Sequence, residues 1–242
     1  MGASYFLSQH VHVCIAGNQV VLLDLERDKY LALARTQSLA AWVRGWPAPA
    51  GRAVSAAELV GSLEGENPEN RLLARMISEG LVVTDPAQGK EASPVVMQQA
   101  NATLVEFEMS VRPRVALGHL GNLAAAFAAA KWSLKYRHIK EVVRAAGARK
   151  GRVPSIEANI RTIRPLVAAF IYLRPLFYTV HNACLLDSLT LLHFLARYRV
   201  FPTWVFGVQT EPFYPHCWVQ QGDIVFNDTP DRIRGYSPIL VI

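Results

Sequence analysis

Cysteine is scarce in this chain: only Cys14, Cys184 and Cys217 occur among its 242 residues. A sparse and odd set argues against a disulfide framework and favours a reducing compartment. The longest apolar stretches, 123–130 and 165–173, fall well short of the roughly 20 residues that a membrane-spanning helix needs. The first residues also lack the basic and apolar regions of a signal peptide. We therefore expect a cytoplasmic protein that does not bind membranes.

Motifs for metals and phosphates are also missing. The chain has no CxxC or HxxxH pair, so a zinc site built from Cys184, Cys217 and nearby histidines is a weak alternative. It has no GxxxxGK[ST] loop for nucleotide phosphates and no recognisable pair of catalytic carboxylates. The sequence therefore predicts neither a metal nor a cofactor bound directly to this chain.

Charge is distributed unevenly along the chain. Residues 1–90 carry 8 Lys+Arg and 9 Asp+Glu, which gives −1, whereas residues 91–242 carry 17 and 10, which gives +7; the sum is the overall +6. A polar stretch rich in proline and glycine lies where the charge changes. We predict a domain over residues 1–85, a linker over 86–100 and a second domain over 101–242.

The first domain shows strand signals followed by helix signals. Alternating apolar residues predict strands over 11–15, 20–25 and 29–33, the first two joined by a Gly17-Asn18 turn. Helices are predicted from about residue 36 to 44, from Ser55, and from Pro68 until Gly80. Three strands and three helices in this order indicate a winged-helix-like domain.

Three roles fit such a domain. DNA binding is disfavoured, because Arg71 and Arg75 are offset by Glu69 and Glu79 and the domain is slightly acidic. A purely structural role is the second. In the third, the edge of strand 29–33 accepts an extended peptide while the third helix supplies side-chain pockets. The candidate contact residues for such a peptide are Tyr30, Leu31, Leu33, Leu72, Arg75 and Met76.

A cysteine stands at the start of a leucine-rich segment in the second domain. Leu185, Leu189, Leu192 and Leu195 recur at helical spacing, which indicates a buried helix. Asn182 is a suitable N-cap, which would place Cys184 in the first turn. Unpaired amides and the helix dipole favour a thiolate there, and the same amides can bind an oxyanion.

A later hairpin supplies a candidate base. With the three-residue loop 221–223, His216 lies directly across from Asp228 on one face of the sheet, and the carboxylate can fix the histidine tautomer. A two-residue loop would pair His216 with Thr229 and turn Asp228 to the other face. The catalytic interpretation therefore requires the longer loop. By the same alternation, Cys217 faces away from His216.

A structural interpretation of these residues stays open. A buried cysteine is most often a core residue, and spacing patterns of this kind do not transfer between families. Asp187, one turn after Cys184, would raise the thiol pKa, and the sequence assigns it no role. Upstream, residues 115–147 and 154–178 look helical, with a flexible basic loop at 147–152. The basic face of this region is either solvated or a docking surface for an acidic partner or a nucleotide.

A family resemblance adds to this pattern. Residues 205–220, with Gly222 and Asn227-Asp228, resemble the C-terminal signature of the lasso-peptide maturation proteases, the microcin-J25-processing B proteins. The shared pattern is a cysteine before a leucine-rich run, a Gly-Val strand, His-x-Trp-Val-Glu, a glycine turn and Asn-Asp. Gln220 departs from the usual glutamate, and Cys217 replaces a small residue. The first domain resembles the PqqD-like leader-recognition domain.

This resemblance implies an α+β protein whose second domain has a papain- or transglutaminase-like fold. It implies a leader peptidase in which Cys184 attacks, His216 transfers the proton and Asp228 orients His216. It also implies two partners, a ribosomal precursor peptide and an asparagine-synthetase-like cyclase that uses ATP. Two alternatives remain: a transglutaminase- or acyltransferase-like enzyme with the same three residues, and a non-catalytic peptide-binding scaffold.

Overall fold

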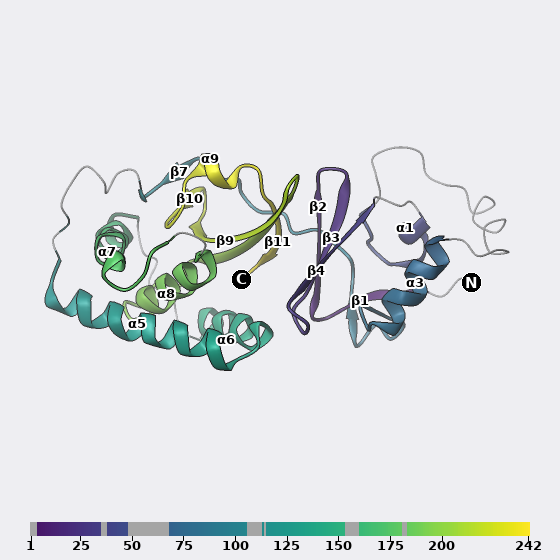
Figure 1. Cartoon of the computed structure of the whole chain (residues 1–242), viewed down its shortest axis with the longest axis horizontal. Helices are drawn as coiled ribbons and strands as arrows, with labels where there is room; N and C mark the ends of the chain where they lie inside the picture. Colours follow the sequence, from purple (N-terminus) through teal and green to yellow (C-terminus); the bar gives the residue numbers. More distant parts are fainter. Residues whose placement is uncertain are drawn as a thin grey trace. The chain divides into compact units, whose positions relative to one another are not determined.

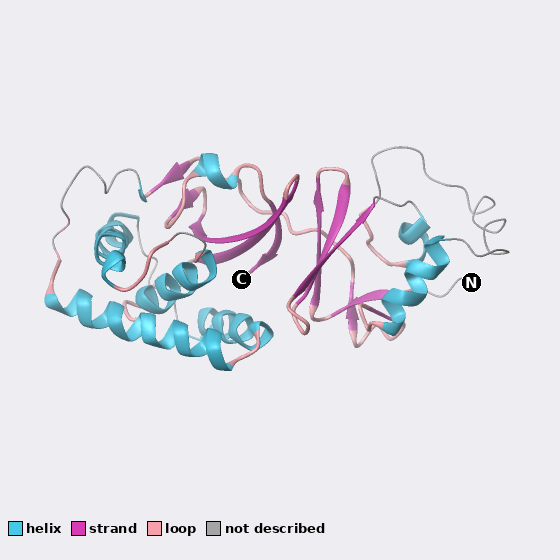
Figure 2. Cartoon of the chain, viewed as in Figure 1, coloured by secondary structure: helices cyan, strands magenta, loops and turns pink. Residues whose placement is uncertain are grey.

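The computed structural model of the chain divides into two compact units, Met1–Val95 and Val96–Ile242. Helices and strands occur together in both units (Figure 2). The structure describes residues 4–34, 38–47, 68–105, 113, 115–152, 160–180 and 183–242.

The first unit contains the three strands that the sequence predicts. They are β2 (Val11–Ala16), β3 (Gln19–Asp24) and β4 (Lys29–Ala34), and they form an antiparallel sheet in the order β2-β3-β4. The turn between β2 and β3 has two residues, since Ala16 pairs with Gln19. Gly17 has a φ of 56°, in the left-handed region that glycine adopts without strain. The predicted Gly17-Asn18 turn is therefore confirmed.

A second small sheet is absent from the sequence prediction. It has the order β5-β1-β6, with β1 (Phe6–Ser8) in the centre between β5 (Val82–Val83) and β6 (Gly89–Lys90). The predicted winged-helix-like plan has a single three-stranded sheet, so it does not account for this unit. Strand β6 also lies inside the segment 86–100 that was expected to be a linker, and that part of the segment belongs to the first unit.

Two helices of the first unit are described, α1 (Ser38–Trp42) and α3 (Pro68–Ser78). The predicted helix that opens at Ser55 lies outside the described residues. Helix α3 begins at Pro68 as predicted and is followed by Gly80, whose φ is 67°. The amides of Gly80 and Leu81 donate to the carbonyls of Ile77 and Met76, which completes the end of the helix.

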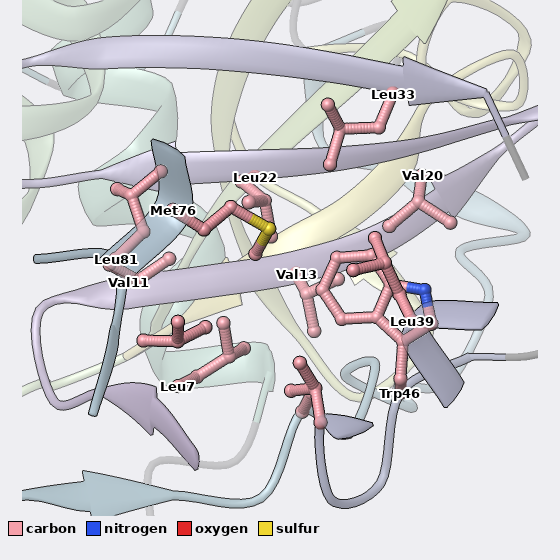
Figure 3. Packing of buried hydrophobic residues seen from close by; sticks show 13 residues of the cluster. Leu7, Val11, Val13, Val20, Leu22, Leu33, Leu39, Trp46, Met76 and Leu81 are labelled. Carbon is pink, nitrogen blue, oxygen red and sulfur yellow. The ribbon is translucent and has the colours of Figure 1, made fainter. Parts of the chain in front are cut away.

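The core of the first unit joins both sheets to α3. In Figure 3, Met76 of α3 lies beside Leu22 of the central strand β3. Ile77, the next residue of α3, is 42% exposed. The buried members of the core are Leu7, Val11, Val13, Val20, Leu22, Leu33, Leu39, Val43, Trp46, Met76, Leu81, Val82 and Ala92.

The second unit is built on a five-stranded sheet. Its order is β11-β8-β9-β10-β7, and only the β10–β7 pair is parallel. The strands are β7 (Ala102–Thr103), β8 (Thr203–Thr210), β9 (Phe213–Gln221), β10 (Ile224–Val225) and β11 (Ser237–Val241).

Helices pack around one helix that contacts the sheet. Helix α8 contacts both α5 and β9 and lies between them in Figure 1. No described helix is long and apolar enough to cross a membrane. The helices of this unit are α5 (Leu117–Tyr136), α6 (Ile139–Arg152), α7 (Ile160–Leu173), the 3₁₀ turn η1 (Arg174–Leu176), α8 (Cys184–Ala196) and α9 (Pro230–Ile233).

Residues 115–147 are mostly helical, as predicted, with a break between α5 and α6. The basic segment 147–152 is helical too, so the prediction of a loop there is wrong. Tertiary contacts explain this error. Arg149 Nη1 lies 2.7 Å from His193 Nδ1 of α8, and Lys150 Nζ donates to Thr203 Oγ1 at 3.1 Å. These contacts fix a segment whose glycines indicated flexibility.

Candidate active site

Cys184 is the first residue of α8, as the sequence predicts for a nucleophile. The cap position is Ala183, whose side chain makes no capping bond, so the prediction of Asn182 as the cap is wrong; Asn182 itself lies outside the described residues. The first backbone bond of the helix runs from the Asp187 amide to the Ala183 carbonyl at 2.8 Å. The amides of 184–186 therefore lack acceptors within the helix. Cys184 is partly exposed, and most of α8 behind it is buried.

The register of the His216 hairpin differs from the prediction. Ile224 pairs with Gln221 and Val225 with Gln220, so the loop has two residues, Gly222 and Asp223. Gly222 has a φ of 58°, which suits this turn. The three-residue loop predicted from the sequence is therefore wrong.

His216 and Asp228 nevertheless meet, because the chain leaves the ladder early. Strand β10 ends at Val225, and residues 226–228 form a bend. Beyond the bend, Asp228 Oδ2 lies 2.5 Å from His216 Nε2. The inference that a two-residue loop would separate this pair is also wrong, because it assumed a regular strand through Asp228.

His216 packs against two aromatic rings and is only 4% exposed. Its ring lies 5.1 Å from that of Tyr236 and 6.0 Å from that of Trp218, between centroids. Opposite His216 in strand β8 is Gly207, where a Cβ atom would lie 2.8 Å from the Trp218 ring and 3.1 Å from Tyr236 Cβ. Because Nε2 faces Asp228, the buried Nδ1 is the ring nitrogen left for the thiol.

The site favours a thiolate on Cys184 and an imidazolium on His216. Hydrogen bonds from the Cys217 thiol and from His216 lower the pKa of Cys184 to about 4, although burial opposes this. Burial opposes protonation of His216 too, but the hydrogen bonds to Asp228 and Cys184 outweigh it and raise the pKa of His216 to about 9. Between these two values the pair is charged and ready to attack a carbonyl group.

Cys217 belongs to the site, although the sequence predicted only that it faces away from His216. Helix α8 packs on the face of β9 that Cys217 occupies, and Ser188 Oγ of α8 donates to the Cys217 carbonyl at 3.2 Å. Cys217 therefore lines the same hollow as Cys184 and His216. Burial raises the pKa of the Cys217 thiol well above its usual range, so this thiol stays protonated and donates a hydrogen bond to the Cys184 thiolate.

The ion pair predicts how alkylation of Cys184 depends on pH. Iodoacetamide reacts with thiolates. The wild-type rate is therefore expected to rise with a midpoint near pH 4, where Cys184 loses its proton, and to stay high at neutral pH. In His216→Ala the midpoint is expected near the ordinary thiol value of about 8.5. Mass spectrometry of the alkylated protein from about pH 2 to pH 10 measures both midpoints.

The other cysteines do not confuse this measurement. Burial raises the pKa of Cys14 to about 12, and the pKa of Cys217 is also raised, so both thiols stay protonated at neutral pH. A single alkylation thus reports on Cys184. A wild-type midpoint near that of a free thiol would contradict the ion pair.

Asp187, for which the sequence gave no role, is a buried carboxylate with an ion-pair partner. It is 1% exposed, and Arg174 Nη1 donates to both of its oxygens at 2.9 and 3.0 Å. Tyr178 Oη donates to Oδ1 at 2.9 Å. Sequence analysis missed Arg174 and Tyr178, because no local pattern connects them with Asp187 across the intervening residues.

Gln220, which stands where the signature usually has glutamate, is a buried residue with three hydrogen bonds. It is 1% exposed, accepts a hydrogen bond from Trp218 Nε1 at 2.9 Å, and donates to the carbonyls of Gln98 and Gly222 at 2.8 and 2.6 Å. A glutamate would keep the first bond and lose both donors. The departure from the family pattern is therefore matched by the local contacts of this chain.

The residues proposed for peptide binding in the first unit fall into two groups. Tyr30, Leu31 and Arg75 line one hollow, which encloses about 770 Å³ including solvent at its open side. Leu33 and Met76 are core residues instead, and Leu72 packs partly buried against the same core. Strand alternation predicts that Leu31 and Leu33 lie on the same face of the sheet. It does not predict which of them α3 covers, so the division could not be obtained from the sequence.

Other side chains complete the surroundings of Cys184. The hollow around Cys184, His216 and Asp228 is also lined by Val180, Tyr214 and Arg232. Arg232 Nε lies 3.9 Å from Asp228 Oδ1. Among the described residues, no three His, Cys, Asp or Glu side chains gather closely enough to hold a metal ion. The hollow therefore presents a thiolate, an imidazolium and a carboxylate in series.

Residues 122–241 match the profile of the transglutaminase-like superfamily, Transglut_core3. The match includes Cys184, His216 and Asp228. No curated protein and no solved structure matches the chain. A domain of this kind fits a cysteine-protease or acyltransferase type of activity. The profile match and the arrangement of thiol, imidazole and carboxylate together identify residues 122–241 as a transglutaminase-like superfamily domain.

Proposed function

We propose that this chain is a leader peptidase that binds a ribosomally made lasso precursor peptide and hydrolyses the amide bond between leader and core. The observation that carries this proposal is the arrangement of Cys184, His216 and Asp228 around one hollow. Cys184 is partly exposed there, so a substrate can reach its thiol. The C-terminal signature of residues 205–228, which resembles that of the lasso-peptide maturation proteases, supports the substrate class.

The charged pair suits peptide hydrolysis. The Cys184 thiolate attacks the scissile carbonyl carbon, and the unpaired amides of the first turn of α8 stabilise the oxyanion. His216 gives its proton to the leaving amine, which frees the core and leaves a thioester on Cys184. Water then attacks the thioester while His216 takes its proton. The leader carboxylate leaves and the thiolate is restored.

Asp228 keeps His216 in the state that this sequence needs. Its carboxylate accepts a hydrogen bond from Nε2–H, so Nδ1 exchanges protons with the thiol and the leaving amine. Hydrolysis of the thioester needs only water as a second reactant, and the chain's own side chains supply the acid and the base. A partner, the ATP-dependent asparagine-synthetase-like cyclase, would close the ring on the amine that cleavage frees.

The first unit would capture the leader. Strand β4 is an edge of its three-stranded sheet, and an extended peptide can add there by backbone hydrogen bonds. Tyr30, Leu31 and Arg75 line the hollow beside this edge and would contact leader side chains. Capture in the same chain raises the effective concentration of the scissile bond at Cys184.

Product masses test the proposed reaction. The chain would be incubated with a panel of lasso-type precursor peptides, with and without the cyclase and ATP. A leader with a new carboxylate and a shortened core indicate hydrolysis. An amide adduct of the leader would instead indicate the alternative, acyl transfer to an amine with the same three residues. Intact precursors under all conditions would contradict both reactions and favour a peptide-binding scaffold.

Leader capture gives a separate prediction. Tyr30→Ala removes a ring from the hollow beside β4, so the dissociation constant for a fluorescent leader peptide is expected to rise about 10-fold, the usual effect of losing a contact aromatic side chain. Fluorescence anisotropy measures it. Tyr172→Ala makes the same change at a position in the other unit that is 55% exposed, and it should leave binding unchanged. Equal binding by the Tyr30 variant and wild type would refute the assignment of this hollow as the leader-binding site.

A further inference from the structure

We propose that Asn227 and Asp187 form a clamp that positions Asp228 beside His216. Neither clamp residue reaches the scissile bond in the proposed reaction, so their role is to position the group that acts. The inference rests on the proposed thiol chemistry, because it assigns a role to residues around the same Cys184.

Asn227 lies in the bend that follows the end of strand β10 at Val225. The Phe226 amide still donates to the Val219 carbonyl at 2.9 Å, but the Val219 amide donates to the side-chain Oδ1 of Asn227 at 2.8 Å. A side chain thus takes the acceptor role that a backbone carbonyl has in a regular ladder. The backbone is free to bend after Phe226, and the bend turns Asp228 toward the imidazole.

The other end of the Asn227 side chain reaches the helix of the nucleophile. Its Nδ2 donates to Asp187 Oδ2 at 2.7 Å and to Ser188 Oγ at 3.1 Å. Asp187 lies three residues after Cys184, so the two share a face of α8. One amide side chain therefore connects the strand that carries the base with the first turns of the helix that carries the thiol.

Asp187 can act as a fixed anchor because all its bonding positions are occupied. Oδ1 accepts from Arg174 and Tyr178, and Oδ2 accepts from Arg174 and Asn227. Rotation of the carboxylate would leave a buried donor without a partner. Arg174 is itself 9% exposed, so the charges of the ion pair compensate each other inside the unit.

Asp228 also has contacts outside the clamp. The Thr229 amide donates to its Oδ1 at 2.8 Å, and the Thr103 hydroxyl donates to its backbone carbonyl at 2.6 Å. Loss of the clamp should therefore displace the carboxylate without removing it. A displacement of roughly one ångström commonly costs about 100-fold in rate.

A purely structural role is the alternative, and it predicts a different result. A buried ion pair with a hydrogen-bonded asparagine could stabilise the unit and leave the thiol unaffected. The unfolding midpoint would then fall while the pH profile of Cys184 stayed the same. Measuring both stability and thiolate formation on the same variants distinguishes the positioning role from the purely structural role.

The test uses the full chain with Asn227→Ala and Asn227→Asp. The aspartate has the size of asparagine and keeps the acceptor for Val219, but it has no amide protons for Asp187. Circular dichroism and urea unfolding establish that each variant is folded. Iodoacetamide alkylation of Cys184 from about pH 2 to pH 10 then gives the midpoint, and cleavage of a precursor peptide gives kcat and KM.

The clamp predicts a specific pattern. The alkylation midpoint of both variants is expected to rise by about one pH unit, because a displaced Asp228 stabilises the imidazolium less and His216 then stabilises the thiolate less. The kcat is expected to fall about 100-fold with KM within about 3-fold of wild type. Unchanged midpoints in the folded variants would overturn the clamp.

Gln220→Leu is the matched control. Gln220 is a buried amide on the same strand as His216, but its partners are Trp218, Gln98 and Gly222, away from Asp187. This variant should be less stable than wild type and should keep the wild-type alkylation midpoint. Alkylation needs no peptide. A normal wild-type profile without cleavage would therefore refute the proposed function and leave the clamp standing.

Discussion

Cys184→Ala is expected to lower the rate of leader release by about 10⁵-fold, because removing a nucleophile removes the covalent route. What remains would be binding and the amides at the start of α8. The measurement is the mass of the products formed from a precursor peptide by wild type and variant, with the cyclase and ATP present and absent. Binding of the leader to the first unit should be unchanged.

Cys14→Ala is the matched control for this variant. It makes the same substitution at a buried cysteine of the other unit, so it tests the effect of removing a thiol without touching the hollow. Its cleavage rate should be close to that of wild type. Equal cleavage by Cys184→Ala and wild type would refute the protease assignment and leave a peptide-binding function for the first unit.

Asp228→Asn is expected to lower kcat by about 10³- to 10⁴-fold while the chain stays folded. The amide has nearly the shape of the carboxylate but carries no charge, so the imidazolium loses its counter-ion and the tautomer is no longer fixed. The hydrogen bond to Asp228, together with that to Cys184, raises the pKa of His216 to about 9 in the wild type. Without it the pKa of His216 falls, so the alkaline limit of activity is expected to move to lower pH. A rate profile over pH 5–10 measures both effects.

Asp231→Asn is the control for Asp228→Asn. Its side chain is 84% exposed and lies 3.1 Å from Arg234, so the same chemical change is made close by and outside the hollow. The rate and the alkaline limit should both match those of wild type. If Asp228→Asn behaved like this control, Asp228 would have no role in orienting His216.

The sequence predicted that Cys184, His216 and Asp228 share one site, and the structure places all three around one hollow. The reason that His216 and Asp228 meet could not be predicted. Residue counting predicts strand register only while both strands stay regular. Here the turn has two residues, and the Asn227 side chain takes a backbone position in the ladder. Asn227 is part of the C-terminal signature, but no pattern in the sequence indicated that its side-chain oxygen would replace a backbone carbonyl of the ladder.

Local signals were reliable where the local backbone decides the structure. The Gly17-Asn18 turn and the start of α3 at Pro68 depend on the conformations of those residues themselves. Distant contacts decide the remaining features. The helical segment 147–152 is fixed by residues on α8 and β8, and the anchor of Asp187 comes from the turn after α7. Neither could be obtained from neighbouring residues in the chain.

Gly207 has a consequence for comparing this chain with others. A side chain at this position would meet the Trp218 ring and Tyr236, the two aromatic residues beside His216. Any substitution at 207 must therefore move the surroundings of the histidine. In a sequence that keeps the cysteine, histidine and aspartate but replaces this glycine, we expect a catalytically impaired protein. The residue at position 207 would thus help to distinguish active from inactive homologues.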